Sequence, residues 1–395
     1  MASENVLPFP IRQGLPASSR LIPSRLRDAR KVARLSQAEL GERCGVTRQA
    51  ISAYERGDKS PEAATFTRLA DALNQPISFF TSEDRPRFGD TGLKFFRRFG
   101  PDTARRNDAC AVLGDWFVQT VRYFDDFVNY PAVQVPEATS DTPLGRYSGD
   151  DIDKIAEDCC KQWGLGLGPI SNVLSLLESK GIAICRYELT GERVEAFSFW
   201  NGDHPFIFMA SEKEANVRTR YDLSHELGHL VLHRWIESQE LEDPKILKAI
   251  ESEADRFAGA FLLPSNSFPN EIFTTRLDAF VGLKRRWLVS VQAMIYRCRD
   301  LGLIDEDQFL NLYKQISYRR WRTREPLDDP AVLPLEQPRL LRRALELVTG
   351  ADRKHRDEIV NDLRLSPTLL EAFCNLPPGA LSLPVQETIA DPTLK

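Results

Sequence analysis

Hydrophobic residues in the first 82 positions recur at the three- and four-residue spacing of helices, in runs that are short. Small polar residues that can cap helix N-termini precede the first three runs: Ser24, Ser36 and Thr47. Glu39 follows Ser36 at the capping-box distance, and glycines at 45 and 57 suit the left-handed ends of the second and third helices. Residues 24–82 therefore predict a run of short helices, two of them joined by a glycine turn.

The pattern changes in the middle of the chain. Residues 108–130 keep helical spacing and predict a long packing helix, which also suits a dimerisation element. After a loop and two helices, three short β-type runs follow: residues 182–187, 194–199 and 205–210. Because helices stand before and after these strands, we expect an α+β unit with a small antiparallel or mixed sheet.

Helical spacing returns at residues 224–233, 248–264 and 283–304, and four prolines mark residues 326–338 as a linker before short helices. The expected fold is multidomain: an all-α helix-turn-helix head, an α+β unit with a small sheet and an α-helical C-terminal region. The expected parts are 20–83 (head), 84–149 (linker and packing helix), 150–325 (α+β unit) and 326–395 (linker and small helices). The FFRRF cluster at 95–99 is expected to dock the linker rather than to touch nucleic acid.

Composition is that of a globular chain, with 42% hydrophobic and 28% charged residues. No apolar run approaches 18 residues, and the first ten lack the order of a signal peptide, so we expect a cytoplasmic protein without a membrane span. The seven cysteines are odd in number and form no CxxC, which argues against a disulfide scaffold or a cysteine-rich zinc site.

Charge is distributed unevenly. Residues 1–106 hold 19 Lys+Arg against 12 Asp+Glu, a net +7, whereas the remainder holds 33 against 45, a net −12. A basic head on an acidic body suggests that the head meets a polyanion.

The head has a specific resemblance. The stretch LSQAELGERCGVTRQAISAYERGDKSPEAATFTRLADAL resembles the Xre/lambda-repressor family of DNA-binding domains over about 58 residues. The resemblance implies that Arg48, Gln49 and Ser52 read base edges of a double-stranded operator, and that Gln37 contacts backbone or base. Basic residues before them would offer phosphate contacts: Arg25, Arg27, Arg30, Lys31 and Arg34.

Three of the five histidines fall within nine positions, in SHELGHLVLH. His225 and His229 match HExxH, so on a helix both imidazoles lie on one face and can reach one metal ion, with Glu226 beside the attacking water. His233 is about 12 Å further along the helix from His225, too far to share that ion, and is expected to be a hydrogen-bonded or packing histidine. The metzincin pattern is excluded, because position 235 is Trp.

A third ligand is expected from the helix at 248–264, whose acidic residues are Glu251, Glu253 and Asp255. Glu251 and Asp255 are four residues apart and share a face, so Glu251 can ligate while Asp255 accepts a hydrogen bond from a ligand histidine. Glu253 points about 200° away, so we favour Glu251 as the ligand. An acidic surface face is the alternative, although the helix is apolar elsewhere.

These segments also resemble a known family. SHELGHLVLH with ESEADRFAGAFLLP, and the flanking WGLGLGPISNVLSLLESKGIAI and LKRRWLVSVQAMIYRCRDLGLI, look like the ImmA/IrrE zinc metallopeptidases over about residues 150–325. The resemblance implies a zincin-like fold for the α+β unit, with Zn²⁺ held by His225, His229 and Glu251, and with Glu226 as general base. Its members act as regulatory proteases that cleave a helix-turn-helix repressor. The oxyanion donor is not fixed by the sequence; Tyr221, Arg218 and His204 are candidates.

Residues 283–304 resemble a second helix-turn-helix, and residues 284–324 hold 10 Lys+Arg against 4 Asp+Glu. We favour helical packing with a solvated basic face over a second nucleic-acid contact.

Two functions are compatible with this sequence. The first is a transcriptional regulator that is also a zinc endopeptidase, DNA-bound as a homodimer, which cleaves a repressor or itself on a signal. The second is a DNA-binding repressor or antitoxin with a non-catalytic or ligand-sensing zincin domain, which would bind a cognate toxin.

Overall fold

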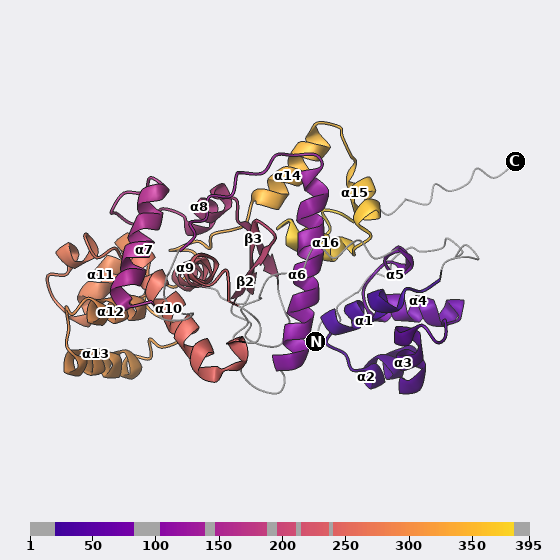
Figure 1. Cartoon of the computed structure of the whole chain (residues 1–395), viewed down its shortest axis with the longest axis horizontal. Helices are drawn as coiled ribbons and strands as arrows, with labels where there is room; N and C mark the ends of the chain where they lie inside the picture. Colours follow the sequence, from indigo (N-terminus) through magenta and orange to yellow (C-terminus); the bar gives the residue numbers. More distant parts are fainter. Residues whose placement is uncertain are drawn as a thin grey trace, which may run out of the picture. The chain divides into compact units, whose positions relative to one another are not determined.

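The computed structural model describes residues 20–82, 103–138, 147–187, 196–210, 215–236 and 240–382 (Figure 1). These residues divide into two compact units, which we describe separately. Residues 20–82, 103–113 and 364–366 belong to the first, and the other described residues to the second. The FFRRF cluster lies outside the described residues.

The first unit is helical, as the hydrophobic pattern predicts. Its helices are α1 (Pro23–Val32), α2 (Gln37–Cys44), α3 (Arg48–Arg56), α4 (Ala63–Ala72) and α5 (Ile77–Thr81). Ser36 and Glu39 form the predicted capping box, and Thr47 caps α3. The prediction of Ser24 as the first cap is wrong: Ile22 precedes the helix, and Pro23 begins it. Proline, which lacks an N–H, suits the first helical position, so no side-chain cap is needed there.

Two glycines shape the turn between α2 and α3. Gly45 ends α2 with φ of 64°, a left-handed conformation that costs other residues more. A Cβ on Gly41 would lie 2.7 Å from the carbonyl oxygen of Val46. The bare Cα of Gly41 therefore lets the turn pass close to α2, which fixes the angle at which α3 leaves it.

Two of the arginines expected to contact phosphate are used inside the first unit instead. Arg25 is buried, with its guanidinium 4.9 Å from the ring centre of Phe79. Arg30 forms an ion pair with the buried carboxylate of Glu55 at 2.5 Å. Both side chains stabilise the helical packing. The expectation of a phosphate contact is therefore wrong for Arg25, which is buried. Arg30 would have to give up its ion pair with Glu55 to bind a phosphate.

The second unit contains the α+β part and the C-terminal helices. Helix α6 (Thr103–Asp125) enters it at Gly114. The elements that follow are α7 (Gly149–Gln162), α8 (Val173–Ser179), β1 (Ala183–Tyr187), β2 (Ala196–Asn201), β3 (His204–Ala210), α9 (Asn216–Leu232), the 3₁₀ turn η1 (Glu240–Glu242), α10 (Pro244–Leu262), the 3₁₀ turn η2 (Phe268–Glu271), α11 (Leu277–Trp287), α12 (Val291–Asp300), α13 (Glu306–Tyr318), α14 (Leu340–Gly350), α15 (Arg356–Leu363) and α16 (Pro367–Phe373).

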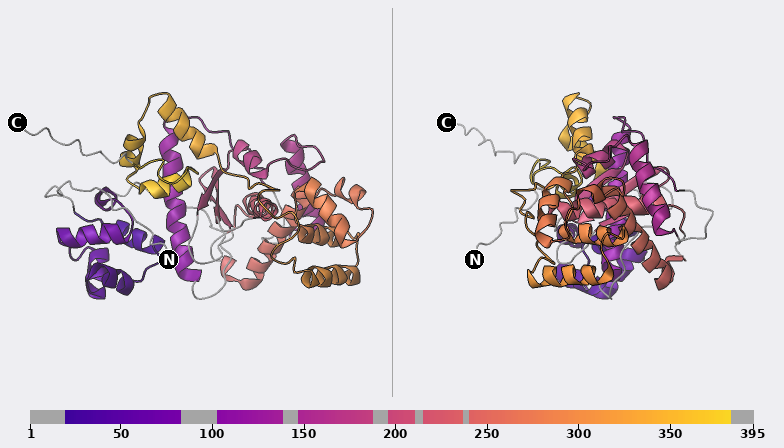
Figure 2. Two further views of the ribbon diagram at one scale, coloured as in Figure 1. Left: turned by 180° about the vertical axis from the view of Figure 1, so that it is seen from behind. Right: turned by 90° about the vertical axis from the view of Figure 1, so that its left-hand side faces the viewer.

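The sheet has three strands in the order β1-β3-β2 and is mixed, one of the two arrangements expected. β1 runs parallel to β3, with Ile184 opposite Ile207, and β2 runs antiparallel to β3, with Ser198 opposite Ile207. Helix α9 lies on one side of the sheet, and α14 and α16 lie on the other (Figure 2). Phe117 of α6 packs its ring against Phe206 and Phe373 on that second side.

Helices α9 and α10 pack unusually closely at one glycine. A Cβ on Gly228 would lie 3.2 Å from both the Cα of Ala254 and the Cβ of Phe257. The missing side chain lets the two helix backbones approach. This approach brings acidic residues of α10 within reach of the histidines of α9.

The proline-containing segment 326–338 is anchored to the second unit by a buried charge. Glu336 pairs with the fully buried Arg220 of α9, and its other carboxylate oxygen accepts a hydrogen bond from the Leu174 backbone N–H at 2.8 Å. If Glu336 moved away, the guanidinium of Arg220 would remain as an unpaired buried charge, which is energetically costly. The segment therefore helps to hold the helix that carries His225 and His229.

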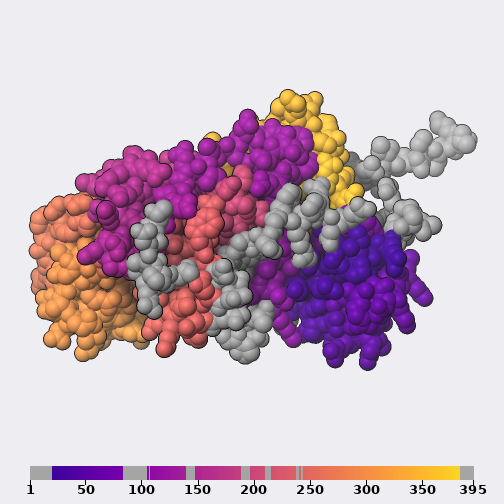
Figure 3. All heavy atoms as spheres, in the orientation of Figure 1, coloured from indigo at the N-terminus to yellow at the C-terminus, as the bar shows by residue number. Residues whose placement is uncertain are grey.

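Helices α11 and α12, for which the sequence suggests a second helix-turn-helix, are joined through Leu288 at φ of 55°, and Ser290 caps α12. Arg297 on α12 is buried and binds the Asp153 carboxylate at 2.9 Å. The side chain of Tyr318 at the end of α13 is exposed. The orange atoms in Figure 3 form one end of the second unit. These contacts favour packing for α12, in line with the expectation from sequence.

Candidate metal centre and candidate DNA-reading helix

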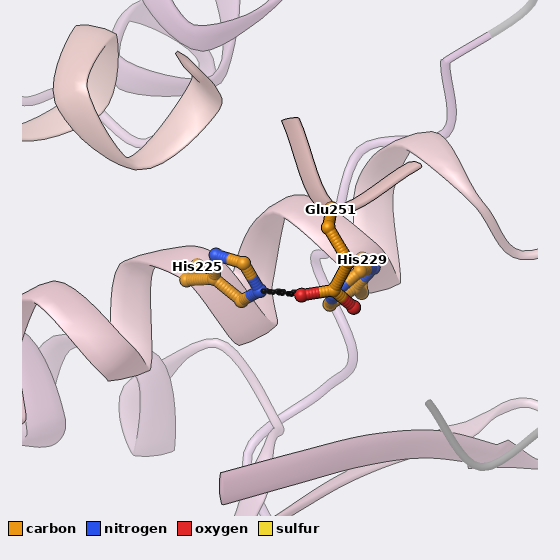
Figure 4. A group of neighbouring side chains, drawn as sticks. All are labelled: His225, His229 and Glu251. Carbon is orange, nitrogen blue, oxygen red and sulfur yellow. Dashed lines mark hydrogen bonds and ion pairs between the residues drawn. The ribbon is translucent and has the colours of Figure 1, made fainter. Parts of the chain in front are cut away.

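Three potential ligands converge between α9 and α10. His225 and His229 lie one turn apart on α9, and Glu251 of α10 points toward both rings (Figure 4). The two Nε2 atoms lie 3.0 Å apart; that of His225 lies 3.6 Å from Oε2 of Glu251, and that of His229 lies 3.6 Å from Oε1 of the same carboxylate. Within the described part of the chain, this is the group of side chains that could hold a metal ion. It is also the ligand set that the sequence predicts.

The spacing of these atoms fits a zinc ion. Ligand atoms about 2.1 Å from a tetrahedral zinc lie about 3.4 Å from one another. The 3.0 Å between the two Nε2 atoms, and the 3.6 Å from each Nε2 to a different oxygen of Glu251, are near that edge length. Two imidazoles and one carboxylate also match the protein ligands of catalytic zinc sites, which leave a fourth position open. The residues present therefore fit Zn²⁺ in both geometry and chemistry.

The Nδ1 atom of each of these two histidines also has a hydrogen-bonding partner. The Nδ1 of His225 lies 2.8 Å from a carboxylate oxygen of Asp255, as the spacing on α10 predicts. Burial lowers the pKa of His225, but hydrogen bonds with Asp255 and Glu251 outweigh it and raise the pKa to about 10. The Nδ1 of His229 lies 3.0 Å from the Nδ1 of His233. Both rings are therefore oriented with Nε2 toward Glu251.

Glu226 follows the first histidine and lies almost entirely out of solvent. Its carboxylate accepts a hydrogen bond from the Ser198 hydroxyl of β2 at 2.6 Å. Burial raises the pKa of Glu226 to about 7, although His225 and the Ser198 hydrogen bond oppose the shift. A carboxylate with its pKa near neutrality can both take and give a proton. Sequence reasoning missed Ser198, because nothing in the strand pattern distinguishes it from other polar strand residues.

Glu253, which helical spacing makes the less favoured ligand, contacts the third histidine instead. The Nε2 of His233 lies 2.9 Å from its carboxylate, and both side chains are buried. Burial lowers the pKa of His233, and the hydrogen bond with Glu253 opposes that shift. His233 is thus hydrogen-bonded, in line with the expectation, but sequence reasoning did not identify its partners.

The three candidates for an oxyanion donor lie in different surroundings. Tyr221 lies one helical turn before His225 on α9, and its hydroxyl donates to the backbone carbonyl of Asp255 at 3.1 Å. Arg218 donates to the carbonyl of Arg322 at 3.3 Å, and His204 begins β3. Tyr221 is therefore the candidate that contacts a residue beside the ligand group, and its assignment stays a prediction.

The predicted DNA-reading residues lie on the surface of the first unit. Arg48 and Gln49 are exposed in the first turn of α3, and Ser52 is half-buried one turn later. The Ser52 hydroxyl accepts from Arg56. Gln37, at the start of α2, donates to the Glu55 carboxylate at 2.8 Å. Arg48 and Gln49 are thus presented outward, whereas Gln37 and Ser52 are already engaged within the unit.

Comparison with known families gives one match in each of the two units. Residues 26–80 match the helix-turn-helix family, and residues 177–299 match the IrrE N-terminal-like domain of the M78 peptidase family. A helix-turn-helix transcriptional regulator of Methanothermobacter thermautotrophicus, itself uncharacterized, is 48% identical over 50 residues, which cover 13% of this chain and 72% of that protein.

The chain belongs to the HTH-type transcriptional regulators. Two further uncharacterized regulators of this type, from Sinorhizobium medicae and Rhizobium meliloti, are each 41% identical over 71 residues, 18% of this chain. The chain spans about half the length of those two relatives, 49% in each case. This regulator also carries the IrrE-like domain, whose matched residues include His225, His229 and Glu251. In the described residues, no helix is long and apolar enough to cross a membrane.

Proposed function

We propose that this HTH-type regulator binds double-stranded operator DNA and is also a zinc-dependent endopeptidase that cleaves a repressor, or itself, in response to a signal. One observation carries the peptidase part: two histidines and a glutamate converge with zinc-like spacing directly beside the buried Glu226. A purely structural zinc site needs no such glutamate. A DNA-reading head in the same chain directs this chemistry toward regulation rather than toward the digestion of peptides.

The head supports DNA binding through a surface formed by α3. Arg48 and Gln49 are exposed, and Arg and Gln make bidentate contacts with guanine and adenine respectively. Regulators of this type bind paired half-sites as dimers, so we propose a homodimer on DNA. The site of action is then the cytoplasm, where the genome of a bacterium or archaeon lies.

The centre supports amide hydrolysis with defined roles. His225, His229 and Glu251 would hold the zinc ion, which supplies a polarised carbonyl and a water of lowered pKa. Glu226 takes the proton of the attacking water and passes it to the leaving amine. Asp255 holds the ring of His225 through Nδ1 at 2.8 Å, and Tyr221 is the candidate donor to the developing oxyanion.

A second candidate function is supported by the same glutamate. Glu226 is only 5% exposed, and one of its carboxylate oxygens already accepts a hydrogen bond from Ser198. These contacts would suit a domain that binds zinc and senses a ligand without catalysis. The chain would then be a DNA-binding repressor or an antitoxin that holds a cognate toxin.

The substitution Glu226→Gln separates the two functions. Glutamine can still accept from Ser198, so the fold and the zinc content should remain, whereas hydrolysis should fall by about 10²–10⁴-fold without the general base. The readouts are zinc per chain by metal analysis, new chain termini by mass spectrometry, and output of the regulated promoter in cells. Glu306→Gln, an exposed site on α13, serves as the matched control.

Equal regulation of the promoter by wild type and Glu226→Gln would show that proteolysis is not the function. The second candidate would then stand. Loss of zinc from Glu226→Gln would instead show that Glu226 is needed for the site itself, and would contradict its role as general base.

A further inference from the structure

The third histidine occupies a position that the proposed chemistry does not use. His233 immediately follows α9 and is 1% exposed, and its backbone N–H donates to the His229 carbonyl at 3.0 Å. Its two ring nitrogens face different partners: Nδ1 lies 3.0 Å from the Nδ1 of His229, and Nε2 lies 2.9 Å from Glu253. The ring therefore bridges a candidate ligand and a buried carboxylate.

Glu253 determines the direction of this chain of hydrogen bonds. One of its oxygens faces His233, and the other accepts from the backbone N–H of Tyr147 at 3.0 Å. A carboxylate bound in this way is an acceptor on both oxygens, so the hydrogen between it and His233 belongs to Nε2 of the histidine. The Nδ1 of the neutral ring is then an acceptor.

The consequence reaches the candidate ligand. If Nδ1 of His233 accepts, the hydrogen in the next contact belongs to Nδ1 of His229. The lone pair of His229 then lies on Nε2, which faces Nε2 of His225 at 3.0 Å and an oxygen of Glu251 at 3.6 Å. The direct contact with Asp255 would likewise keep the hydrogen of His225 on Nδ1 when a metal ion takes Nε2. Two lone pairs thus converge on one point.

We propose that His233 and Glu253 are positioning residues, which together hold His229 in the Nδ1–H tautomer and fix its ring so that Nε2 faces the metal position. Each ligand histidine is backed by a carboxylate of α10: His225 directly by Asp255, and His229 through His233 by Glu253. This inference rests on the proposed zinc site. It explains why a third histidine, too distant to ligate, is buried beside the other two.

The test measures Zn²⁺ affinity of the full-length chain by competition with a chromophoric chelator, so it needs no substrate. Loss of a hydrogen-bonding partner behind a ligand histidine costs about 10–100-fold in metal affinity. His233→Leu replaces the ring with an apolar side chain of similar bulk, and it should weaken Zn²⁺ binding by that factor. His233→Asn places an oxygen near the position of Nδ1, can still accept from His229, and should recover most of the affinity.

His355→Leu is the matched control, because this histidine is exposed directly before α15 and the substitution is the same. A second readout reports the tautomer directly: ¹⁵N–¹H correlation of the ring signals, which is tractable with five histidines in the chain. His229 should carry its hydrogen on Nδ1 in the zinc-loaded wild type, and should lose that single tautomer in His233→Leu.

The outcomes separate this inference from the proposed function. A wild type that binds no zinc would contradict the proposed site and this inference with it. A wild type that binds zinc, with His233→Leu equal to it in affinity, would overturn the positioning role alone. If His233→Leu fails to fold, Glu253→Gln decides, because its amide cannot accept from both His233 and Tyr147. Unchanged affinity and tautomer in Glu253→Gln would likewise overturn the proposal.

Discussion

The two candidate sites of this chain present their side chains in opposite ways. On α3, Arg48 and Gln49 extend from the first turn into solvent. Between α9 and α10, by contrast, His225 is 4% exposed and His229 is 1% exposed. Each of these two rings is held through its far nitrogen, one by a carboxylate and the other by a third histidine.

The difference follows from what each surface has to do. A side chain that reads base edges has to adjust to the groove and to exchange water for bases, so only the helix that carries it must be rigid. Metal ligands have to converge within a few tenths of an ångström, so their rings need partners of their own. Substitutions should therefore act locally in the head, and should disturb packing as well as chemistry in the centre.

The largest expected effect on folding comes from Gly228→Ala. Its new Cβ would meet the backbone of Ala254 and the Cβ of Phe257 at 3.2 Å, and neither can move without shifting a helix. We expect unfolding free energy to fall by about 1–3 kcal/mol, as for overpacked cores, measured by urea denaturation.

Gly282→Ala on α11 is the matched control, since a Cβ there meets nothing within 4 Å. Alanine is a better helix former than glycine, so this variant should gain about 0.5–1 kcal/mol. Equal stability changes for the two variants would mean that the close approach of α9 and α10 is not what Gly228 provides.

The smallest expected effect on folding comes from Arg48→Ala in the head. The side chain is exposed, so the unfolding free energy should change by less than about 0.5 kcal/mol. Operator affinity should fall by about 1–3 kcal/mol, with relaxed discrimination at one base pair, in a binding assay at fixed salt. Lys161→Ala, an exposed charge on α7 in the second unit, controls for the loss of one positive charge. Sequence-specific binding that survives Arg48→Ala intact would remove this arginine from the reading surface.

Local signals in the sequence anticipate much of the fold and the ligand group. The capping box of Ser36 and Glu39 and the stop at Gly45 lie within one helix and its turn, so their spacing alone predicts them. The same holds for His225 and His229, which share a helix face at four-residue spacing. Glu251 follows from spacing relative to Asp255 on a second helix, and the two side chains do meet the two histidines.

Contacts between distant segments could not be predicted in this way. Ser198 reaches Glu226 across 28 positions, and Glu336 reaches Arg220 across 116. Neither polar residue carries a local pattern that names its partner, because strand register and chain path decide which side chains meet. The pairing of His233 with Glu253, 20 positions apart, depends on the close approach of two helices at a glycine.

Metal content tests the central claim most directly. The full-length chain, purified without chelator, should carry about one zinc ion per chain, as expected for a site with two histidines and one glutamate. Glu251→Ala should lose that zinc, whereas Ser252→Ala, its exposed neighbour on α10, should retain it. A metal-free wild type, or a Glu251→Ala variant with zinc content equal to that of the wild type, would contradict the assignment of His225, His229 and Glu251 as a zinc site.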